Sequence, residues 1–452
     1  MDIIIAGGGQ VGLTMARQLS AEGHNLTIID ENTAILEEAV QRYDALGICG
    51  NCASREVLEQ AKIAETELVI ASTNADEVNL LCCMTAHGIN PNIHTIARIR
   101  NPEYADQVLT MPEVFPISLT VNPERRAALE IEQLLKFPGF LRRDNFAKGR
   151  TQIVELRVEP GSKLAGAALM DLGSIVKCKV LVCAVLRSGT AITPSGNFVL
   201  REGDRIFVTA PTDNLAALLK NLGIITRRVR SVLICGGGRI SYYLAKLLEK
   251  DNISVTILEK DYDRCLALAK QLPSTSVIHG DCTNHSTLEE QGIANCDAVV
   301  TLTNTDETNM VISMFAGSRN VPQIITRLSH GSNIPIADAM NLGSIIIPRE
   351  LCSNIIVRYV RAMENQIGAA VSVHAIADGQ VEAVEFLVDD TTRNRDIPLK
   401  KMKLRPNVLV VSITHGSKTF IPDGDSIFCA GDTVVVVTSG RGVLNQINDI
   451  FA

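Results

Sequence analysis

One glycine-rich signature occurs twice in this chain, once in each half, and it constrains the fold more than any other feature. The first copy reads MDIIIAGGGQVG from Met1 to Gly12 and the second reads VLICGGGRIS from Val232 to Ser241. Each joins an apolar run to an amphipathic stretch and continues into a second apolar run that ends in an acid, Asp30 or Glu259. Both acids lie 23 residues after the first glycine of their copy (30 − 7 and 259 − 236). The two copies are offset by 229 residues (236 − 7), which indicates an internal repeat.

This spacing matches the needs of a bound dinucleotide. The first glycine permits the tight turn out of a strand, the second lets the backbone approach the pyrophosphate, and the third lets helix and strand pack closely. Phosphate then lies on the unpaired N–H groups at the helix start. The acid accepts hydrogen bonds from ribose hydroxyls and repels a 2′-phosphate, which favours NAD over NADP. Two copies in register favour this interpretation over glycine-rich turns without a ligand.

The halves stay parallel beyond the glycine loops. Gly50-Asn51-Cys52 corresponds to Gly280-Asp281-Cys282, and Leu68 to Leu81 corresponds to Ala298 to Val311. Short apolar runs alternate with helix-length amphipathic segments, which predicts an α/β fold with two tandem Rossmann-like, doubly wound parallel sheets. Polar residues that follow strands line the nucleotide crevice of such sheets, or else serve as turns and caps. Both readings stay open for Asn51, Thr73 and Asn74 and for Asp281, Thr303 and Asn304.

After each nucleotide lobe the pattern changes from helical to alternating, which predicts a small α+β lobe with Gly-Asp turns at Gly203 and Gly431. The expected parts are a first nucleotide lobe at 1–121, a crossover helix and linker at 122–150, a small lobe at 151–228, a second nucleotide lobe at 229–348, a crossover helix at 349–369 and a second small lobe at 370–452.

Composition bounds the class of protein. With 452 residues and 46% hydrophobic side chains, the chain is long enough for about three ordinary domains with buried cores. Its apolar stretches fall short of the ~20 residues that a membrane helix needs. The N-terminus opens directly into a strand pattern, which predicts no secretory signal. Twelve scattered cysteines fit a reducing compartment, so we expect a cytoplasmic protein.

The charge pattern argues against a nucleic-acid partner. The net charge is −7, aromatic residues make up 4% and Trp is absent, whereas nucleic-acid surfaces carry basic patches. Two local basic clusters lie near expected domain junctions and favour solvated linkers over contacts with an anion or a lipid headgroup. They comprise Arg142, Arg143, Lys148 and Arg150, and Arg227, Arg228 and Arg230.

Cys49-Gly50-Asn51-Cys52 has the CxxC spacing of redox and zinc sites. The repeat partner of Cys49 is His279, and no second cysteine pair stands nearby in the sequence, so a structural turn is the preferred interpretation. Cys82 and Cys83 lie on a predicted helix and are expected to be buried small apolar residues. The eight histidines show no paired ligand spacing, and we expect no metal site.

A catalytic role is not indicated. A dehydrogenase needs a positioned acid or base beside the nicotinamide, usually from a substantial substrate domain. The appended lobes here are small, duplicated and poor in such residues, so a non-catalytic sensor is preferred and an NAD-dependent oxidoreductase is the alternative. A redox-sensing transcription regulator would require a DNA-reading element and a basic surface, and the sequence indicates neither.

GGGQVG with Asp30, the TNADE and TNTDE segments, Arg98 and Arg327, the NPERR crossover helix and the Gly-Asp small lobes together resemble the regulator-of-potassium-conductance (RCK, or KTN) module. Two such units cover essentially the whole chain. The resemblance implies a nucleotide-sensing regulatory subunit, four chains forming a ring on the inner face of the membrane, and a membrane-embedded potassium transporter as partner. It implies NAD or NADH, and possible competition by ATP or ADP, at Gly7, Gly8, Gly9, Gln10, Val11, Asp30, Thr73, Asn74 and Arg98, and at Gly236, Gly237, Gly238, Arg239, Ile240, Glu259, Thr303, Asn304 and Arg327.

The second glycine loop departs from the pattern of the first. Ser241 replaces the third glycine, Gly12, and adds a Cβ where helix and strand approach closely. Arg239 replaces Gln10, and Glu259 is one methylene longer than Asp30. An extra cation at a phosphate loop favours a more anionic ligand such as ATP. We therefore expect the two sites to rank their nucleotides differently.

Overall fold

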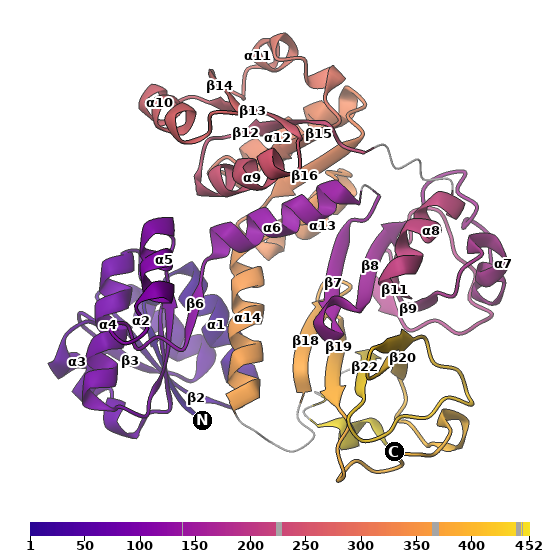
Figure 1. Cartoon of the computed structure of the whole chain (residues 1–452), viewed down its shortest axis with the longest axis horizontal. Coiled ribbons are helices and arrows are strands. Elements are labelled where there is room, and N and C mark those ends of the chain that lie inside the picture. Colours follow the sequence, from indigo (N-terminus) through magenta and orange to yellow (C-terminus); the bar gives the residue numbers. More distant parts are fainter. Residues whose placement is uncertain (138, 223–227, 364–369, 440–443, 445) are drawn as a thin grey trace. The chain divides into compact units, whose positions relative to one another are not determined.

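The computed structural model describes residues 1–452 except 138, 223–227, 364–369, 440–443 and 445. The chain forms two compact units (Figure 1). The first comprises Met1–Ala128 with Ile347–Val360, and the second comprises Leu129–Ile346 with Arg361–Ala452. None of the helices in the described ranges combines the length and the apolar character that a membrane span requires.

A six-stranded parallel sheet forms the centre of the first unit, in the order β3-β2-β1-β4-β5-β6. Its strands are β1 (Asp2–Ala6), β2 (Asn25–Asp30), β3 (Leu46–Cys49), β4 (Leu68–Ala71), β5 (His94–Arg98) and β6 (Leu119–Val121). Its helices are α1 (Gln10–Ala21), α2 (Thr33–Tyr43), α3 (Arg55–Gln60), α4 (Asp76–Ile89) and α5 (Pro102–Thr110), with the 3₁₀ turn η1 (Ile63–Glu65). All four residues of β4 are buried, because helices cover both faces of a doubly wound sheet.

The second unit repeats this sheet in the same order, β14-β13-β12-β15-β16-β17. Its strands are β12 (Ser231–Cys235), β13 (Ser254–Glu259), β14 (Ser276–His279), β15 (Ala298–Thr301), β16 (Gln323–Arg327) and β17 (Ser344–Ile346). The surrounding helices are α9 (Arg239–Lys250), α10 (Tyr262–Gln271), α11 (His285–Glu290), α12 (Asp306–Ser318) and α13 (Ile334–Ala339), with η4 (Ile293–Asn295) and η5 (Gly331–Asn333). The strand order is that of a Rossmann fold, so the predicted fold class of the two nucleotide lobes is confirmed.

Two five-stranded antiparallel sheets form the small lobes, also as predicted, in the orders β10-β9-β11-β8-β7 and β18-β19-β22-β20-β21. The first contains β7 (Arg142–Phe146), β8 (Thr151–Arg157), β9 (Leu181–Arg187), β10 (Thr190–Ile192) and β11 (Arg205–Pro211), with η2 (Ala147–Gly149), η3 (Leu169–Asp171), α7 (Leu172–Val176) and α8 (Thr212–Leu222). The second contains β18 (Ala370–Ile376), β19 (Val381–Leu387), β20 (Val408–His415), β21 (Lys418–Phe420) and β22 (Thr433–Ser439), with η6 (Leu399–Lys401) and η7 (Ile447–Ile450).

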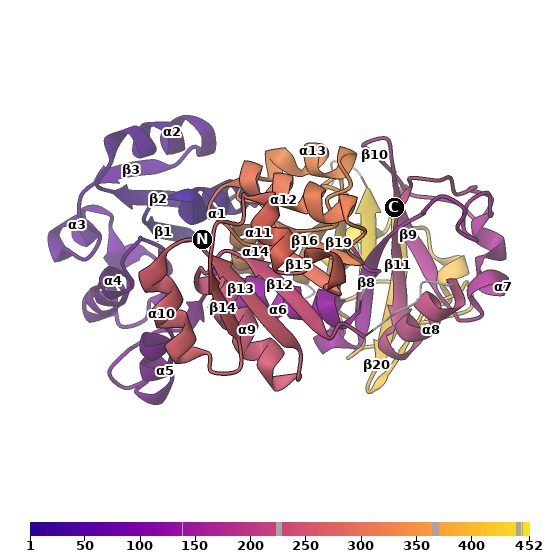
Figure 2. The ribbon, with the colours of Figure 1, turned by 90° about the horizontal axis from the view of Figure 1, so that it is seen from above.

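The two small lobes pack against each other within the second unit (Figures 1 and 2). Buried residues of both sheets, including Phe146 and Phe207 from one and Val411 and Val435 from the other, form a single apolar cluster. Polar contacts flank it: the hydroxyls of Thr151 and Ser412 lie 2.7 Å apart. The alternating apolar residues of the strands therefore bury a shared core.

The basic cluster at 142–150 is not a solvated linker, so that prediction was wrong for its first two members. Strand β7 lies inside the segment expected to be helix and linker, and it pairs with β8 of the small lobe. Arg143 is buried and donates a hydrogen bond to Gln152 Oε1 at 2.6 Å. Arg142 pairs with Asp144 at 3.0 Å. Arg228 and Arg230 are exposed, whereas the Lys148 side chain and Arg227 lie outside the described residues.

The crossover helices are exchanged between the two compact units. Helix α14 (Pro348–Met363) follows the second nucleotide lobe in sequence, yet its residues up to Val360 belong to the first unit. There Gln18 donates a hydrogen bond to Asn354 at 3.3 Å, and His94 Nδ1 lies 2.8 Å from the Tyr359 hydroxyl. Helix α6 (Pro123–Lys136) begins in the first unit and ends in the second, where Gln323 donates to the Leu134 carbonyl at 2.8 Å. Each nucleotide lobe is completed by a helix from the other half.

Candidate nucleotide-binding sites

The first glycine loop connects β1 to α1 and is tight at both ends. Gly7 has φ +99°, a conformation that favours glycine, and a Cβ there would lie 2.8 Å from the Thr73 nitrogen. At Gly12 a Cβ would lie only 2.0 Å from the Gly7 carbonyl oxygen. Gly9, in contrast, is exposed, and a Cβ there would meet nothing within 4 Å. The open middle of the loop lies at the N-terminus of α1, where backbone N–H groups are suited to phosphate.

Asp30 is fixed beside this loop. The Gly8 N–H donates to Asp30 Oδ2 at 2.7 Å, and the Asn32 N–H donates to Oδ1 at 2.9 Å. The half-buried carboxylate thus has a defined orientation at the end of β2. Each oxygen retains a second lone pair, which is what a ribose hydroxyl requires.

The second glycine loop repeats this arrangement between β12 and α9. Gly236 has φ +103°, and the Gly237 N–H donates to Glu259 Oε2 at 2.6 Å. Ser241 is fully buried, and its hydroxyl donates to the Gly236 carbonyl at 2.5 Å. The Cβ that the first loop has no room for is therefore accommodated here by a hydrogen bond to the equivalent carbonyl.

An arginine that the sequence analysis did not single out lies against the second loop. Arg264 on α10 donates from Nε to the Gly237 carbonyl at 2.7 Å and from a terminal nitrogen to the Gly238 carbonyl at 3.4 Å. Arg239, the first residue of α9, is exposed. The repeat counterpart of Arg264 is Ile35, so a charge at an otherwise apolar repeat position was the signal that could have identified it.

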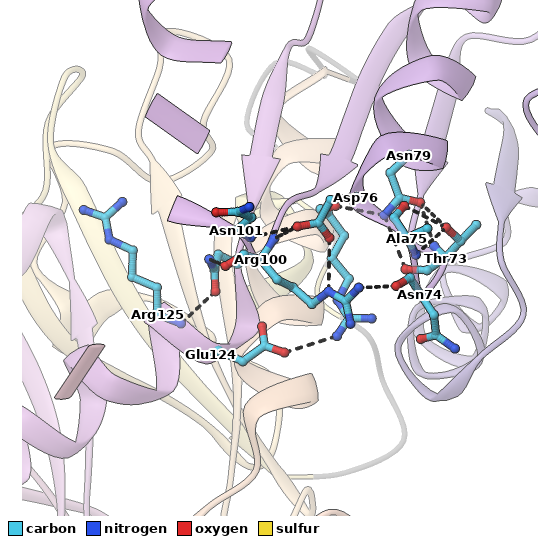
Figure 3. Close-up of polar contacts among 11 residues, drawn as sticks. Thr73, Asn74, Ala75, Asp76, Asn79, Arg100, Asn101, Glu124 and Arg125 are labelled. Carbon is cyan, nitrogen blue, oxygen red and sulfur yellow. Dashed lines mark hydrogen bonds and ion pairs between the residues drawn. The ribbon is translucent and has the colours of Figure 1, made fainter. Parts of the chain in front are cut away.

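A buried asparagine joins the loops after the fourth and fifth strands of each lobe. In the first lobe, Asn79 Oδ1 accepts hydrogen bonds from the Thr73 N–H at 2.8 Å and the Thr73 hydroxyl at 2.7 Å (Figure 3). Asn79 Nδ2 donates to the Arg98 carbonyl at 2.8 Å. In the second lobe, Asn309 makes the same contacts with Thr303 and Arg327, at 2.8, 2.7 and 3.0 Å. Asn79 and Asn309 therefore position the predicted Thr and Arg residues.

The aspartate at the start of the following helix has different partners in the two lobes. Asp76 accepts the Arg100 and Asn101 N–H groups at 2.8 and 2.7 Å and the Arg100 Nε at 3.1 Å (Figure 3). Arg100 also donates to the Asn74 carbonyl. Its repeat counterpart is Ser329, whose N–H donates to Asp306 at 2.7 Å. The first lobe therefore has a guanidinium bound at this rim where the second has a serine.

Burial alone would raise the pKa of Asp306, but the hydrogen bonds it accepts outweigh that effect. The donors are the Ser329 and His330 N–H groups and the Asn333 side chain, at 2.7, 3.3 and 3.0 Å. The pKa of Asp306 consequently lies below its usual value. The carboxylate stays ionised and holds the loop after β16 in place.

Arg98 and Arg327, the predicted arginines at the end of the fifth strand of each lobe, also differ in partner. Arg98 lies 3.4 Å from Glu124 Oε1 on α6, and its side chain is only 12% exposed. Arg327 donates to the Thr303 carbonyl at 2.7 Å. Both guanidinium groups are thus held close to the ends of the parallel strands.

Asn51 and Asp281 act as turn caps, one of the two roles left open by the sequence. Asn51 accepts the Ala53 N–H at 2.9 Å, and Asp281 accepts the Thr283 N–H and hydroxyl, both at 2.8 Å. The Thr283 hydrogen bonds lower the pKa of Asp281. Of the remaining predicted residues, Val11 and Ile240 are buried, and Gln10, Asn74 and Asn304 are exposed.

Family models and similar proteins agree with this architecture. The TrkA-N domain model matches residues 3–114 and 232–348, and the TrkA-C domain model matches residues 153–223. The Trk system potassium uptake protein TrkA homolog 1 of Methanosarcina mazei is 30% identical over 96% of this chain and 97% of its own length. The Trk system potassium uptake protein TrkA of Vibrio alginolyticus is 28% identical, covering 100% of this chain and 98% of its own.

Among solved structures, the GsuK channel bound to NAD shares the fold. Its TM-score is 0.60 at 18% sequence identity, with 97% of this chain and 76% of that chain covered. The duplicated glycine loops, the small lobes that follow each nucleotide lobe and the full-length similarity all agree: the chain belongs to the TrkA family.

Proposed function

We propose that this chain is the nucleotide-sensing regulatory subunit of a potassium uptake system. The observation that carries the proposal is the repeated loop in which an acid receives the second glycine's N–H, Asp30 from Gly8 and Glu259 from Gly237. The full-length relatives are named for potassium uptake. Nucleotide binding would stabilise one arrangement of lobes over another and so bias a partner. A differential affinity of about 100-fold corresponds to ~2.7 kcal/mol of coupling.

The first site is proposed to take NAD or NADH. Asp30, with both oxygens oriented by backbone N–H groups, is placed to receive ribose hydroxyls and to repel a 2′-phosphate. The exposed Gly9 leaves room for the pyrophosphate at the start of α1. A protein of the same fold is described as bound to NAD.

The second site is proposed to favour ATP or ADP relative to the first. Arg264 contacts two carbonyls of its glycine loop, and Arg239 is exposed at the same loop. The first lobe has Ile35 and Gln10 at these positions. Guanidinium groups form strong charge-assisted hydrogen bonds to phosphate, so additional phosphates gain more at the second loop.

The chain is proposed to act as a homotetrameric ring, peripheral on the inner face of the membrane, beneath a TrkH-like transporter subunit. Supporting this, the two repeats expose large apolar side chains at equivalent positions. Leu81 and Met84 on α4 are 52% and 37% exposed, and their counterparts Val311 and Met314 on α12 are 54% and 48% exposed. Repeated apolar faces are suited to contacts between identical chains in closed symmetry.

A sensor binds nucleotides without turning them over, whereas the alternative function, an NAD-dependent oxidoreductase, consumes them. We expect no sustained change in NADH absorbance when the full chain is incubated with candidate hydride acceptors. A steady, enzyme-dependent loss of absorbance would contradict the sensor function and favour the oxidoreductase.

Calorimetric titration of the full chain with NADH, NAD, ATP and ADP tests the binding sites directly. Asp30→Ala should weaken NADH binding by roughly 1.5 to 3 kcal/mol, because a charge-assisted hydrogen bond is lost. Glu31→Ala, which changes the exposed neighbouring acid, serves as the matched control. Equal affinities of Asp30→Ala and the unmodified chain would remove Asp30 from the site.

Complementation tests the transport role. Deletion of the chain from its host should impair potassium uptake at low external potassium. Expression of the Gly9→Asp chain in that deletion strain should fail to restore potassium uptake. Gly173→Asp, on the small-lobe helix α7, adds the same charge at an exposed position with open space and should restore uptake. Full complementation by a folded Gly9→Asp chain that binds no nucleotide would show that nucleotide binding is incidental to transport.

A further inference from the structure

One arginine joins three parts of the second unit by ion pairs. Arg205 begins β11 of the first small lobe, and its Nε donates a hydrogen bond to Glu155 Oε1 on the neighbouring strand β8. Its Nη1 donates to Asp338 Oδ2 on α13 of the second nucleotide lobe. The same Nη1 lies 3.0 Å from Asp378 Oδ2, in the turn between β18 and β19 of the second small lobe. Carboxylates from three parts of the chain therefore meet at one guanidinium.

The cluster is largely shielded from water and has more carboxylates than cations. The side chains of Arg205 and Glu155 are 13% and 4% exposed, and those of Asp338 and Asp378 are 25% and 27% exposed. A second cation, Arg157 on β8, lies 3.9 Å from Asp338 Oδ1. Removal of one partner from a buried ion pair is costly, because the other charge is left uncompensated. The intact cluster therefore holds the two small lobes and α13 in one arrangement.

The contact with α13 is poised to open. Burial raises the pKa of Asp338 above its usual value. Arg205 opposes this shift, whereas two neighbouring carboxylates, Asp378 and Glu155, add to it. The ionised form of Asp338 is consequently less favourable in the folded chain than in water. A modest displacement of α13 is enough to release it.

Helix α13 is fixed at its N-terminal end to the loops of the second nucleotide site. The 3₁₀ turn η5 leads directly into α13, and the Asn333 side chain of η5 donates to Asp306 Oδ2 at 3.0 Å. Asp306 begins α12, three residues after Thr303. Asn309, on the same helix, accepts the Thr303 N–H at 2.8 Å. The predicted nucleotide contact at Thr303 and the start of α13 therefore belong to one hydrogen-bonded frame.

The other end of α13 is held by β16. The Thr326 hydroxyl donates to the Leu342 carbonyl at 2.8 Å, and the Leu342 N–H donates to the Ala337 carbonyl at 3.1 Å. Strand β16 ends at Arg327, another predicted nucleotide contact. A six-residue helix fastened at both ends moves with the loops that hold it. Displacement of these loops therefore reaches Asp338, the neighbour of Ala337.

We propose that occupancy of the second nucleotide site is transmitted through α13 to Arg205, and from Arg205 to both small lobes. This proposal rests on the proposed function, since it takes the second glycine loop to bind a nucleotide. Coupling requires an element with two arrangements that both sites bias, and the Asp338–Arg205 contact, made or broken, is that element. The repeat counterparts of Arg205 and Asp338 are Thr433 and Leu109, so the first half carries no such ion pair at these positions. Regulation by this route belongs to the second site alone.

The first experiment needs no nucleotide. Hydrogen exchange of the full chain is compared between the unmodified protein and Asp338→Asn, which removes the charge and keeps the size. Exchange should rise in the peptide of β16 and η5 and also in the β18–β19 hairpin. Arg205→Thr, which places the residue of the other repeat, should affect the same two peptides. Changes confined to the lobe that carries each substitution would overturn the proposal.

A matched control breaks an ion pair that stays within one lobe. Arg187 pairs with Asp204 at 2.7 Å inside the first small lobe, and the other repeat has His415 at the position of Arg187. Arg187→His should therefore raise exchange in the first small lobe and leave the β16 and η5 peptide unchanged. An equal response of that peptide to Arg187→His would show that any disturbance of the lobe reaches the site, and would overturn the role of Arg205.

The second experiment adds ATP to the full chain with the first site closed by Gly9→Asp. ATP should change hydrogen exchange in β11 and in the β18–β19 hairpin, and Asp338→Asn should lose both responses. Asp378→Asn, at a left-handed residue with φ +56° that asparagine tolerates, should keep the response of β11 and lose that of the hairpin. ATP binding without a response in the small lobes, or a hairpin response that persists in Asp338→Asn, would overturn the proposal.

Reciprocity gives the last test. Asp338→Asn and Arg205→Thr should change the ATP affinity of the second site in the same direction, each by about fivefold or more. The double variant should differ little from either single variant, because both interrupt one contact. Opposite directions or additive effects would overturn the proposal. Absence of ATP and ADP binding in the unmodified chain would instead count against the proposed function, and exchange without nucleotide would still decide whether the cluster links the site loops to the small lobes.

Discussion

The two nucleotide lobes have the same strand order and the same buried asparagine frame, yet they place different groups around the glycine loop. The first lobe has Gly12 and Ile35 there, and the second has Ser241 and Arg264. Duplication has therefore preserved the hydrogen bonds that hold the loops, Asn79 in one lobe and Asn309 in the other. What changed is the charge and the space available to a ligand. A repeated fold therefore does not imply a repeated ligand preference.

Closing one site at a time in the full chain should have the largest effect on nucleotide binding. Gly9 and Gly238 each have open space where a Cβ would lie, so Gly9→Asp and Gly238→Asp add a carboxylate beside the expected phosphate without a steric clash. Juxtaposed like charges cost several kcal/mol, so affinity at the altered site should fall by about 100-fold or more. Calorimetry should then show one remaining site with a different nucleotide order in each variant. The same order in both variants would show that the lobes are equivalent.

Exchange of the residues at the third glycine position tests the steric difference between the two loops. Gly12→Ser places a Cβ 2.0 Å from the Gly7 carbonyl and should destabilise the first lobe by about 2 to 3 kcal/mol, as overpacking does. Ser241→Gly removes one hydrogen bond and should cost about 1 kcal/mol. Hydrogen exchange of the β1 and β12 peptides reports each lobe separately. Equal protection losses in the two variants would show that the second loop is as tight as the first.

Arg264→Ile gives the second lobe the residue that the first lobe has at this position. It tests how the difference in charge between the two glycine loops affects nucleotide binding. Loss of a guanidinium at the loop should lower ATP affinity by about tenfold, or ~1.4 kcal/mol, while NAD affinity changes less. Lys270→Ile, an exposed cation on the same helix, is the matched control. The calorimetric titration is best performed in a chain that carries Gly9→Asp and retains Gly238. The first site is then closed, and only the second site binds nucleotide. An equal loss for ATP and NAD would assign Arg264 a structural role only.

The smallest expected effect concerns acid stability of the second lobe. Because the pKa of Asp306 is lower in the folded state, its hydrogen bonds stabilise the fold above the usual Asp pKa of about 4, and this contribution is lost as the pH falls through the lowered value. Asp306→Asn should therefore reduce stability at pH 7 by about 1 kcal/mol and flatten its decline in acid. Hydrogen exchange of the β16 peptide between pH 7 and pH 3 measures this. An unchanged pH profile in the variant would assign the acid response to other groups.

Features that depend on local pattern were predictable from the sequence. The glycine loops, the apolar strands and the acid at the end of the second strand follow one another within about 30 residues, so the fold class could be derived from spacing. The repeat then confirmed the register, because each element in one half had its counterpart in the other. The predicted contacts to a nucleotide stay predictions.

Features that depend on distant contacts were not predictable. Arg143 was expected in a solvated linker, but β7 pairs with β8 and buries the side chains of Arg143 and its neighbour Asp144. Asp144 interacts with Arg142 and with His374, 230 positions away, and although burial opposes it these partners lower the pKa of Asp144 to about 2. Asn79 sits in an amphipathic helix pattern, and only the fold brings Thr73 and Arg98 to it. Periodicity indicates which face is buried, but not which polar residue on that face has partners.

The exchange of α6 and α14 has a consequence for synthesis. Domains generally fold as units while the chain emerges from the ribosome, N-terminal first. The first unit, however, requires residues up to Val360, so it stays open while the whole of the second nucleotide lobe is being made. During that interval the surface of α1 and β5 that later receives Asn354 and Tyr359 is unprotected. Translation stalled before residue 347 would therefore leave the first nucleotide lobe without the helix that completes it, whereas the second lobe would already have α6.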